Sequence, residues 1–316
     1  MRISVADLLM APWTVQVVFT AVRLNLFTIL AERMMTVEEI ASQCGATPNR
    51  LESLLNVCAS MGLVVLEEGK YFNSHFSRIH LVEGEPRYVG DFIKHQHDIA
   101  NKWDGLLTAV AGKASPEADQ ATDAAFHKTF IKAMNNLGML GEAEALQNVV
   151  DLDGCQEMVD VGGGSGLYSV ILCQKHPELR STILDRRETL SITKDMIAGY
   201  KEAQRITLRE ADYTRDDFGE EVDVVLLSDV IYDESKAAPV LKKAWNCLRG
   251  NGILVVRGYY SDPAKSNPFF GALFVLNMLL FDPESKTMTI SSLEKQIREV
   301  GFTITRVAPL TERSTL

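Results

Sequence analysis

The sequence has no long apolar run, no paired cysteines and no surplus of basic residues. Its longest apolar stretch, near Gly271–Phe281, contains Asn277 and is far shorter than the ~20 residues that a membrane-spanning helix needs. The five cysteines are odd in number and include no Cys-x-x-Cys pair, which argues against a disulfide framework and against structural zinc. Asp7 and Pro12 lie where a signal peptide would have its apolar core. We therefore expect a cytoplasmic protein with no metal and no membrane partner.

Charge and length set further limits. The chain has 316 residues and a net charge of -10, and the two halves that meet at residue 150 carry five net negative charges each. A nucleic-acid partner requires a basic face, so we expect none. The composition, 46% hydrophobic and 23% charged, is ordinary for a globular protein. Because the chain is about twice the ~150 residues of one domain, we expect two or more domains.

The N-terminal part, residues 1–85, has the pattern of a winged helix. Apolar side chains recur at helical spacing over residues 13–33. Thr36 and Glu39 form a capping-box pattern that begins a helix at Val37, and Thr47-Pro48 begins a second helix that ends at Gly62. A hairpin pattern follows over residues 63–73.

Winged helices often bind DNA, but the charge of this one argues against it. Residues 36–70 contain five acidic side chains against two basic ones, Arg50 and Lys70. The second helix is mostly apolar, so it cannot release counterions from a phosphate backbone. We expect this domain to pack against protein, either in a dimer or over a substrate.

The rest of the chain predicts a helical region and then an α/β domain. Residues 86–150 have helical patterns, interrupted by a polar break at Gly112–Asp123, and are expected to link the halves and line a pocket. Residues 151–316 alternate short apolar strands with helices, which predicts a Rossmann-like parallel sheet covered on both faces. The expected strands are 158–161, 182–184, 206–208, 222–227 and 253–256, and a last helix and strand are expected at 293–300 and 302–307.

A glycine loop is the most informative segment of the sequence. Asp160-Val161-Gly162-Gly163-Gly164-Ser165-Gly166 follows a predicted strand and precedes a predicted helix. Glycines let the backbone turn tightly and approach a ligand, and the helix N-terminus offers free N–H groups. The spacing does not give Gly-x-Gly-x-x-Gly, so a dinucleotide is not favoured. Asp185 ends the next strand, where a carboxylate can accept the hydroxyls of a ribose.

With these motifs placed, the whole chain resembles the class I S-adenosylmethionine-dependent small-molecule O-methyltransferases, typified by the caffeic acid and acetylserotonin enzymes. Asp160–Gly166 is similar to their motif I, and Ala21–Phe27 with Thr36–Ala41 is similar to their dimerisation domain. The resemblance implies a homodimer and S-adenosyl-L-methionine as cofactor. It also implies a cofactor site made of Asp160, Gly162, Gly164, Gly166, Asp185, Asp212, Tyr213 and Ser228.

The sequence departs from this family at the catalytic base. The family usually has Val-Leu-His-Asp-Trp after the fourth strand, and this chain has Val230-Ile231-Tyr232-Asp233-Glu234. The family's Lys-Glu-Arg-Thr, whose glutamate orients the histidine, is here Lys286-Thr287-Met288-Thr289. A tyrosine with an ordinary pKa of about 10 is a poor base at neutral pH and a good hydrogen-bond donor. We expect Tyr232 to orient the acceptor.

Four residues are candidates for contact with the acceptor. Phe130–Met134 resembles the family's pocket-lining segment, and Asn277 and Met278 resemble its Asp-x-x-Met-Leu segment. Met134 is one candidate, and His127 falls on the same helical face three and seven residues before Phe130 and Met134. The substrate candidates are therefore Met134, His127, Asn277 and Met278.

These observations predict methyl transfer from S-adenosylmethionine to a hydroxyl of a small aromatic or heteroaromatic metabolite. Two alternatives remain open. Carbon or nitrogen methylation is one, because bacteriochlorophyll-ring carbon methyltransferases have a similar Ile-Leu-Tyr segment where this chain has Val230-Ile231-Tyr232. A binding or assembly protein that kept the cofactor pocket and lost catalysis is the other.

Overall fold

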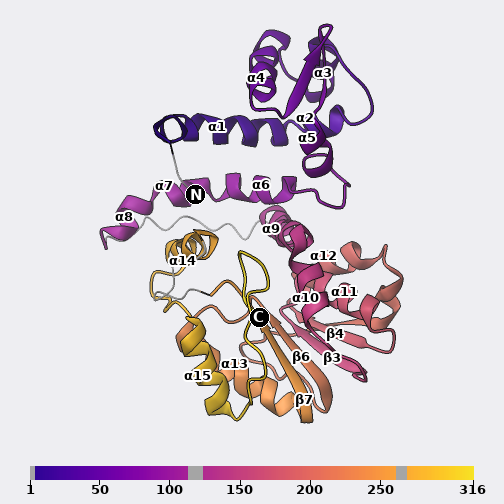
Figure 1. The fold of residues 1–316 in the computed structure, drawn as a ribbon, viewed down its shortest axis with the longest axis vertical. Helices are drawn as coiled ribbons and strands as arrows, with labels where there is room; N and C mark the ends of the chain where they lie inside the picture. The colour runs from indigo at the N-terminus through magenta and orange to yellow at the C-terminus, as the bar shows by residue number, and fades with distance from the viewer. Residues whose placement is uncertain (1–3, 113–123, 261–268) are drawn as a thin grey trace. The chain divides into compact units, whose positions relative to one another are not determined.

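The computed structural model describes residues 4–112, 124–260 and 269–316. The chain forms two compact units, residues 1–99 and residues 100–316 (Figure 1). The boundary falls inside residues 86–150, the region that the sequence predicted as a separate linker, so this region is shared between the two units. The predicted break at Gly112–Asp123 lies, apart from Gly112, outside the described residues.

The first unit contains the helices and the hairpin that the sequence predicted. The pair Thr36 and Glu39 forms a capping box, in which the Glu39 carboxylate accepts from the Thr36 N–H at 2.8 Å. The interior is apolar and includes Phe27 and Leu55, which are 1% and 0% exposed. The elements are α1 (Val5–Arg23), α2 (Leu26–Ile29), α3 (Val37–Cys44), α4 (Pro48–Ser60), β1 (Val64–Glu67), β2 (Lys70–Asn73), α5 (His75–His80) and α6 (Gly90–Asp98).

Helix α1 has a largely apolar surface that this unit does not bury. Trp13 is 70% exposed and Leu9 is 64% exposed, whereas Ala21 and Val22 near its end are buried. Among the described residues, α1 is also the one helix whose length and composition would suffice to cross a membrane. Helix α1 does not stand out in the sequence as an uninterrupted apolar run, because Asp7 and several hydroxyl and amide side chains lie between its apolar residues.

The second unit is an α/β layer structure preceded by helices. Its elements before the sheet are α7 (Ala100–Asp104), α8 (Leu106–Val110), α9 (Ala124–Leu137), the π-helical turn η1 (Gly138–Glu142) and α10 (Ala143–Val149). The sheet and its helices are β3 (Glu157–Val161), α11 (Leu167–Lys175), β4 (Arg180–Asp185), α12 (Arg187–Ile197), η2 (Lys201–Arg205), β5 (Ile206–Glu210), β6 (Val222–Ser228), α13 (Glu234–Cys247), β7 (Leu248–Arg257), α14 (Phe269–Phe281) and α15 (Ile290–Val300).

The sheet has the order β5-β4-β3-β6-β7 and is parallel throughout. Alternate residues of β6 face opposite sides, so Val225 and Leu227 join one core while Val224 and Leu226 join the other. Helices α13 and α15 cover the first face and α11 and α12 the second (Figure 1). The chain reverses its direction of strand addition between β3 and β6, and ligands bind such sheets at the carboxyl ends of the strands on either side of that reversal. The predicted Rossmann-like class is confirmed.

The end of the chain differs from the prediction. Residues 302–307, whose alternating pattern predicted a strand, have no strand structure. Instead, Thr315 pairs with Gly258 just beyond β7, with N–H···O distances of 3.0 and 3.1 Å in the two directions. The last residues of the chain therefore pair with the residue that follows the edge strand β7.

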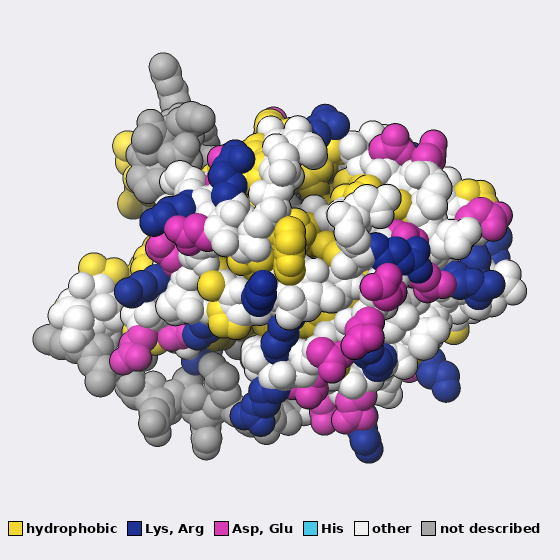
Figure 2. Space-filling view, turned by 90° about the horizontal axis from the view of Figure 1, so that it is seen from below, with side chains coloured by type: hydrophobic (Ala, Val, Ile, Leu, Met, Phe, Trp, Pro, Cys, Tyr) yellow, Lys and Arg dark blue, Asp and Glu magenta, His cyan; other side chains and the backbone are white. Residues whose placement is uncertain are grey.

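Figure 2 shows acidic and basic side chains interspersed on the face it draws.

Helix α4 packs one face, which includes Leu51, Leu55 and Cys58, into the core of the first unit. Leu55 is 0% exposed, so we expect Leu55→Ala to lower the free energy of unfolding by about 2–5 kcal/mol. Leu66, on the neighbouring hairpin, is 48% exposed, and Leu66→Ala should change it by only about 0.5 kcal/mol. Urea unfolding of the whole chain measures both. Equal effects would mean that α4 does not pack as described.

Candidate functional site

The glycine loop follows β3 at the edge where the strand order reverses. Gly162, Gly164 and Gly166 have φ angles of +66°, +55° and +79°, which side chains rarely tolerate. A Cβ atom on Gly166 would lie 2.8 Å from Cγ2 of Ile197, and the Cβ on Gly163 would lie 2.9 Å from Cγ of Asp160. The backbone conformation therefore favours glycine at positions 162, 164 and 166, and close packing favours it at positions 163 and 166. The result is a closely packed backbone turn with few side chains at the start of α11.

The side chain of Asp160 packs against this turn, next to Gly163. Its carboxylate is completely buried and accepts a hydrogen bond from Ser169 Oγ at 2.7 Å, and Ser169 in turn lies 2.8 Å from Ser181 Oγ. Burial raises the pKa of Asp160 to about 6. Its second oxygen, Oδ1, has no hydrogen-bond partner among the described residues. The structure therefore places Asp160 beneath the loop, with one acceptor oxygen unsatisfied.

Asp185 connects the next strand to the loop. Its Oδ2 accepts from the Gly164 N–H at 3.0 Å, and its Oδ1 accepts from the Arg186 N–H at 2.8 Å. Thr193 of α12 donates to the Gly164 carbonyl at 2.5 Å. Hydrogen bonds thus connect the ends of β3 and β4 with α12, and Asp185 lies at the end of its strand, where the sequence placed it.

The third strand contributes Asp212 and Tyr213. Asp212 is exposed and accepts from the Thr214 N–H and hydroxyl at 2.9 and 2.6 Å, which lowers its pKa. Tyr213 lies against the loop: a Cβ on Gly162 would be 3.9 Å from its ring. Ser228, the last residue of β6, is half-buried at the same edge. The predicted cofactor residues therefore gather along one edge of the sheet.

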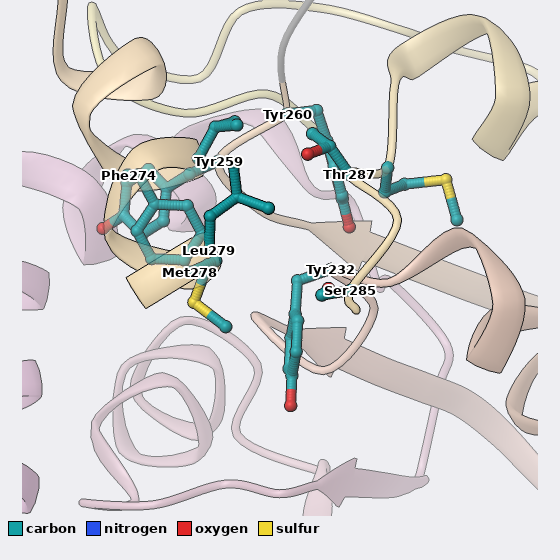
Figure 3. Close-up of a pocket in the computed structure, with 10 residues that line it drawn as sticks. Tyr232, Tyr259, Tyr260, Phe274, Met278, Leu279, Ser285 and Thr287 are labelled. Carbon is teal, nitrogen blue, oxygen red and sulfur yellow. The ribbon is translucent and has the colours of Figure 1, made fainter. Parts of the chain in front are cut away.

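A pocket with both aromatic and hydroxyl groups in its lining lies beyond the rim, beside α14. It is lined largely by aromatic and sulfur-containing side chains. Figure 3 shows the Tyr232 ring standing apart from the others, with its hydroxyl pointing away from Tyr260 and Thr287. The segment that contains Tyr232 borders the loop, because a Cβ on Gly162 would lie 3.2 Å from Cγ2 of Val230. The lining residues are Tyr232, Tyr259, Tyr260, Phe274, Val275, Met278, Leu279, Ser285, Thr287 and Met288.

Of the four predicted substrate residues, Met278 lines this pocket and the other three do not. Consecutive residues of a helix point about 100° apart, so Asn277 faces α7 instead, where its Oδ1 accepts from Trp103 Nε1 at 3.1 Å. Met134 is half-buried on α9. Asn277 thus joins two helices, Met278 lines the pocket, and the role of either residue toward an acceptor stays a prediction.

His127 also differs from its predicted role as an acceptor residue. Its Nε2 lies 3.1 Å from Thr189 Oγ1 on α12, which places it on the rim side near Asp185. Burial lowers the pKa of His127, and the nearby Arg186 lowers it further, which favours the neutral ring. Helical spacing predicted the face correctly, but α12 covers this part of that face.

A buried ion cluster was missed entirely. Arg257 at the end of β7 is 1% exposed, and its guanidinium pairs with Glu142 of η1 at 2.9 Å and with Asp229, the residue after β6. Asp229 has a φ of +56°, unusual for a residue other than glycine. Glu142 further accepts from Thr311 Oγ1 at 2.7 Å. The sequence signal that could have indicated this cluster was an arginine directly after the apolar run Ile253–Val256.

Comparison with known proteins places the chain in a family. Residues 100–303 match a model of the O-methyltransferase domain, and residues 6–83 match the O-methyltransferase dimerisation domain. The chain belongs to the O-methyltransferase family. The predicted family, enzyme class and dependence on S-adenosylmethionine are thereby confirmed, and the dimerisation domain includes most of α1.

Three similar proteins illustrate the range of this family. A 3-hydroxy-5-methyl-1-naphthoate 3-O-methyltransferase of Streptomyces sahachiroi is 29% identical over 87% of this chain and 82% of its own length. A bacteriochlorophyllide d C-20 methyltransferase of Chlorobaculum tepidum is 28% identical over 78% and 75%. The structure of human N-acetylserotonin methyltransferase in complex with S-adenosylmethionine is 22% identical and superimposes with a TM-score of 0.86, covering 98% and 94%.

The residues at the rim fit this cofactor. The left-handed glycines leave a cradle without side chains, the helix α11 begins directly after it, and Asp160 Oδ1 is a buried acceptor without a partner. Backbone N–H groups suit a carboxylate, and the carboxylate of Asp185 suits ribose hydroxyls. The chemistry of the donor set thus matches a ligand that has an amino acid at one end and a nucleoside at the other.

The close packing of Gly166 predicts the effect of a single methyl group. Gly166→Ala combines a positive φ with a contact of 2.8 Å, so we expect at least a tenfold loss of affinity for S-adenosylhomocysteine, measured by calorimetry. Gly199→Ala is the control, because a Cβ there meets nothing within 4 Å. Unchanged affinity in Gly166→Ala would remove the loop from the cofactor site.

The raised pKa of Asp160 predicts how stability depends on pH. Between pH 4 and pH 6 the native state holds a proton that the unfolded state releases, so the native state loses stability as pH rises through this window. Compared with wild type, Asp160→Asn should gain about 3 kcal/mol between pH 4 and pH 7. Urea unfolding at both pH values measures this, and parallel pH profiles of the two proteins would contradict it.

Proposed function

We propose that the protein transfers the methyl group of S-adenosylmethionine to a hydroxyl of a small planar aromatic or heteroaromatic molecule. The observation that carries this proposal is the aromatic, methionine-bearing pocket that Tyr232 lines, next to the segment whose Val230 lies against the glycine loop. Such a lining suits a flat apolar ring with few polar groups. The relative that methylates a hydroxynaphthoate supports the same class of acceptor.

The residues of this chain would act by holding and orienting the reactants. S-adenosylmethionine supplies a methyl group that a positively charged sulfur already activates. Asp185 and the N–H groups of residues 162–166 would hold the cofactor, with Tyr213 and Ser228 beside it. The hydroxyl of Tyr232 would hydrogen-bond the acceptor oxygen, and the apolar wall would keep water out. Catalysis would come mainly from proximity and alignment.

Carbon methylation is the second candidate. The position of the family's histidine base holds Tyr232 in this chain, and one relative is a C-20 methyltransferase. A tyrosine that hydrogen-bonds a ring nitrogen or oxygen would raise electron density at a neighbouring carbon. Both candidates use the same pocket and the same residue, and they differ in the atom that receives the methyl group.

The dimerisation domain supports a homodimer. We propose that the exposed apolar surface of α1, including Leu8, Leu9 and Trp13, packs against a second copy of the chain. In this proposal the predicted winged helix serves assembly, in agreement with its acidic charge and with the apolar character of α4. An exposed apolar surface of this kind is typical of an interface.

The function is tested by a labelled-methyl screen. Purified protein is incubated with S-adenosylmethionine carrying a tritiated methyl group and a panel of naphthols, hydroxyindoles and hydroxyphenazines. Transfer of label to at least one of them is expected. Binding of S-adenosylhomocysteine without transfer to any acceptor would favour the non-catalytic alternative, and absence of binding would contradict both.

Tyr232 is the residue to test once an acceptor is found. Tyr232→Phe removes one hydrogen bond to the acceptor and should lower kcat/KM about tenfold, while leaving the affinity for S-adenosylhomocysteine unchanged. Tyr200→Phe is the control, because Tyr200 is 38% exposed and lies after α12, away from the pocket lining. Equal activity of the two variants would show that Tyr232 does not orient the acceptor.

A further inference from the structure

Arg257 contacts the acceptor pocket through Tyr259. Its guanidinium lies 4.5 Å from the centre of the Tyr259 ring, in the geometry of a cation–π contact, and Tyr259 lines the pocket. The same ring meets Phe270 and Phe274 of α14, with ring centres 5.0 and 5.1 Å apart. A continuous line of contacts therefore runs from the end of β7 to α14.

Helix α14 forms one wall of the pocket, and its neighbours are short helices. Phe274, Met278 and Leu279 come from it. It packs against α7 and α8, where Trp103 donates to Asn277 and Lys102 lies 5.0 Å from the centre of the Phe281 ring. Its contact with Tyr259 joins it to the sheet, which is the rigid part of this unit.

Besides Tyr259, the guanidinium of Arg257 contacts two carboxylates and a second aromatic ring. It pairs with Glu142 and Asp229, and Tyr168 of α11 lies 5.6 Å away on a second aromatic face. The two carboxylates balance its charge and that of Arg313, which is 3.3 Å from Glu142. Moving this guanidinium would break its ion pairs with Glu142 and Asp229.

We propose that Arg257 is a positioning residue that holds the α14 wall of the acceptor pocket through Tyr259. This proposal rests on the proposed function, because it assigns the pocket to the methyl acceptor. Arg257 acts through Tyr259 and Phe274 and touches neither reactant. Its removal should therefore weaken acceptor binding and leave cofactor binding intact.

The first measurement is hydrogen exchange along the chain and needs no acceptor. In Arg257→Met and in Tyr259→Leu, amides of residues 269–281 should exchange at least tenfold faster than in wild type, while those of β3 and β4 keep their rates. Tyr259→Phe keeps the ring and should keep the protection of α14. Arg249→Met is the matched control, because Arg249 joins β7 to Asp223 of β6 at the opposite end of these strands.

The second measurement separates acceptor from cofactor. With 2-naphthol as the acceptor probe, KM should rise roughly ten- to thirtyfold in Tyr259→Leu and Arg257→Met, with calorimetric affinity for S-adenosylhomocysteine within twofold of wild type. If Arg257→Met does not fold, Tyr259→Leu decides, because it leaves every buried charge paired.

The outcomes distinguish this proposal from the proposed function. Unchanged exchange of residues 269–281 in Tyr259→Leu would overturn the positioning role, whatever the enzyme methylates. Equal losses of cofactor and acceptor affinity would also overturn it, since they would indicate general damage. If the wild type neither binds S-adenosylhomocysteine nor methylates any acceptor, the proposed function fails first, and faster exchange of α14 would then support only the structural contact.

Discussion

A guanidinium removed from water needs carboxylate partners, and Arg257 has two, which come from distant parts of the chain. Glu142 comes from the π-helical turn after α9, and Asp229 from the loop that leads to Tyr232. The arginine therefore fixes the loop after β6, the helical segment before the sheet and, through Tyr259, the pocket wall. The ion pairs that neutralise Arg257 therefore connect these three segments to the end of β7.

The second constraint is the backbone of the glycine loop. Three residues in left-handed conformation turn the chain sharply after β3, and the buried carboxylate of Asp160 fills the space beneath them. The cost of burying that carboxylate is seen in its raised pKa. The hydrogen bond from the Gly164 N–H to Asp185 connects this turn to the end of β4 without a ligand. Such a preformed site suits an enzyme that accelerates its reaction by aligning the two reactants.

These local features could be predicted from the sequence, because they depend on residues close together in the chain or on periodic patterns. Alternation of strands and helices gave the parallel sheet, and parallel strands bring their carboxyl ends to one edge, so Asp185, Tyr213 and Ser228 could be placed with the loop. The family's motifs then indicated the cofactor. The comparisons confirm the family, while the individual site residues stay predictions.

Features that depend on distant pairing could not be predicted. Nothing in the sequence joins Glu142 to Arg257, which lie 115 positions apart. The family resemblance assigned Asn277 and Met278 to one pocket, but consecutive helix residues diverge, and only the packing of α7 against α14 shows which one faces the pocket. Likewise, His127 was assigned to the correct helix face, and its partner Thr189 appears only when α12 is in place.

The central claim, that this chain methylates a hydroxyl held beside Tyr232, is tested most directly by identifying the atom that receives the methyl group. A reaction with S-adenosylmethionine labelled with carbon-13 in its methyl group, and with a naphthol acceptor, gives a product whose methyl carbon is observed by NMR. The predicted result is a signal in the range of methoxy carbons, reduced about tenfold in rate for Tyr232→Phe. A signal in the range of methyl groups bonded to ring carbon would contradict oxygen methylation.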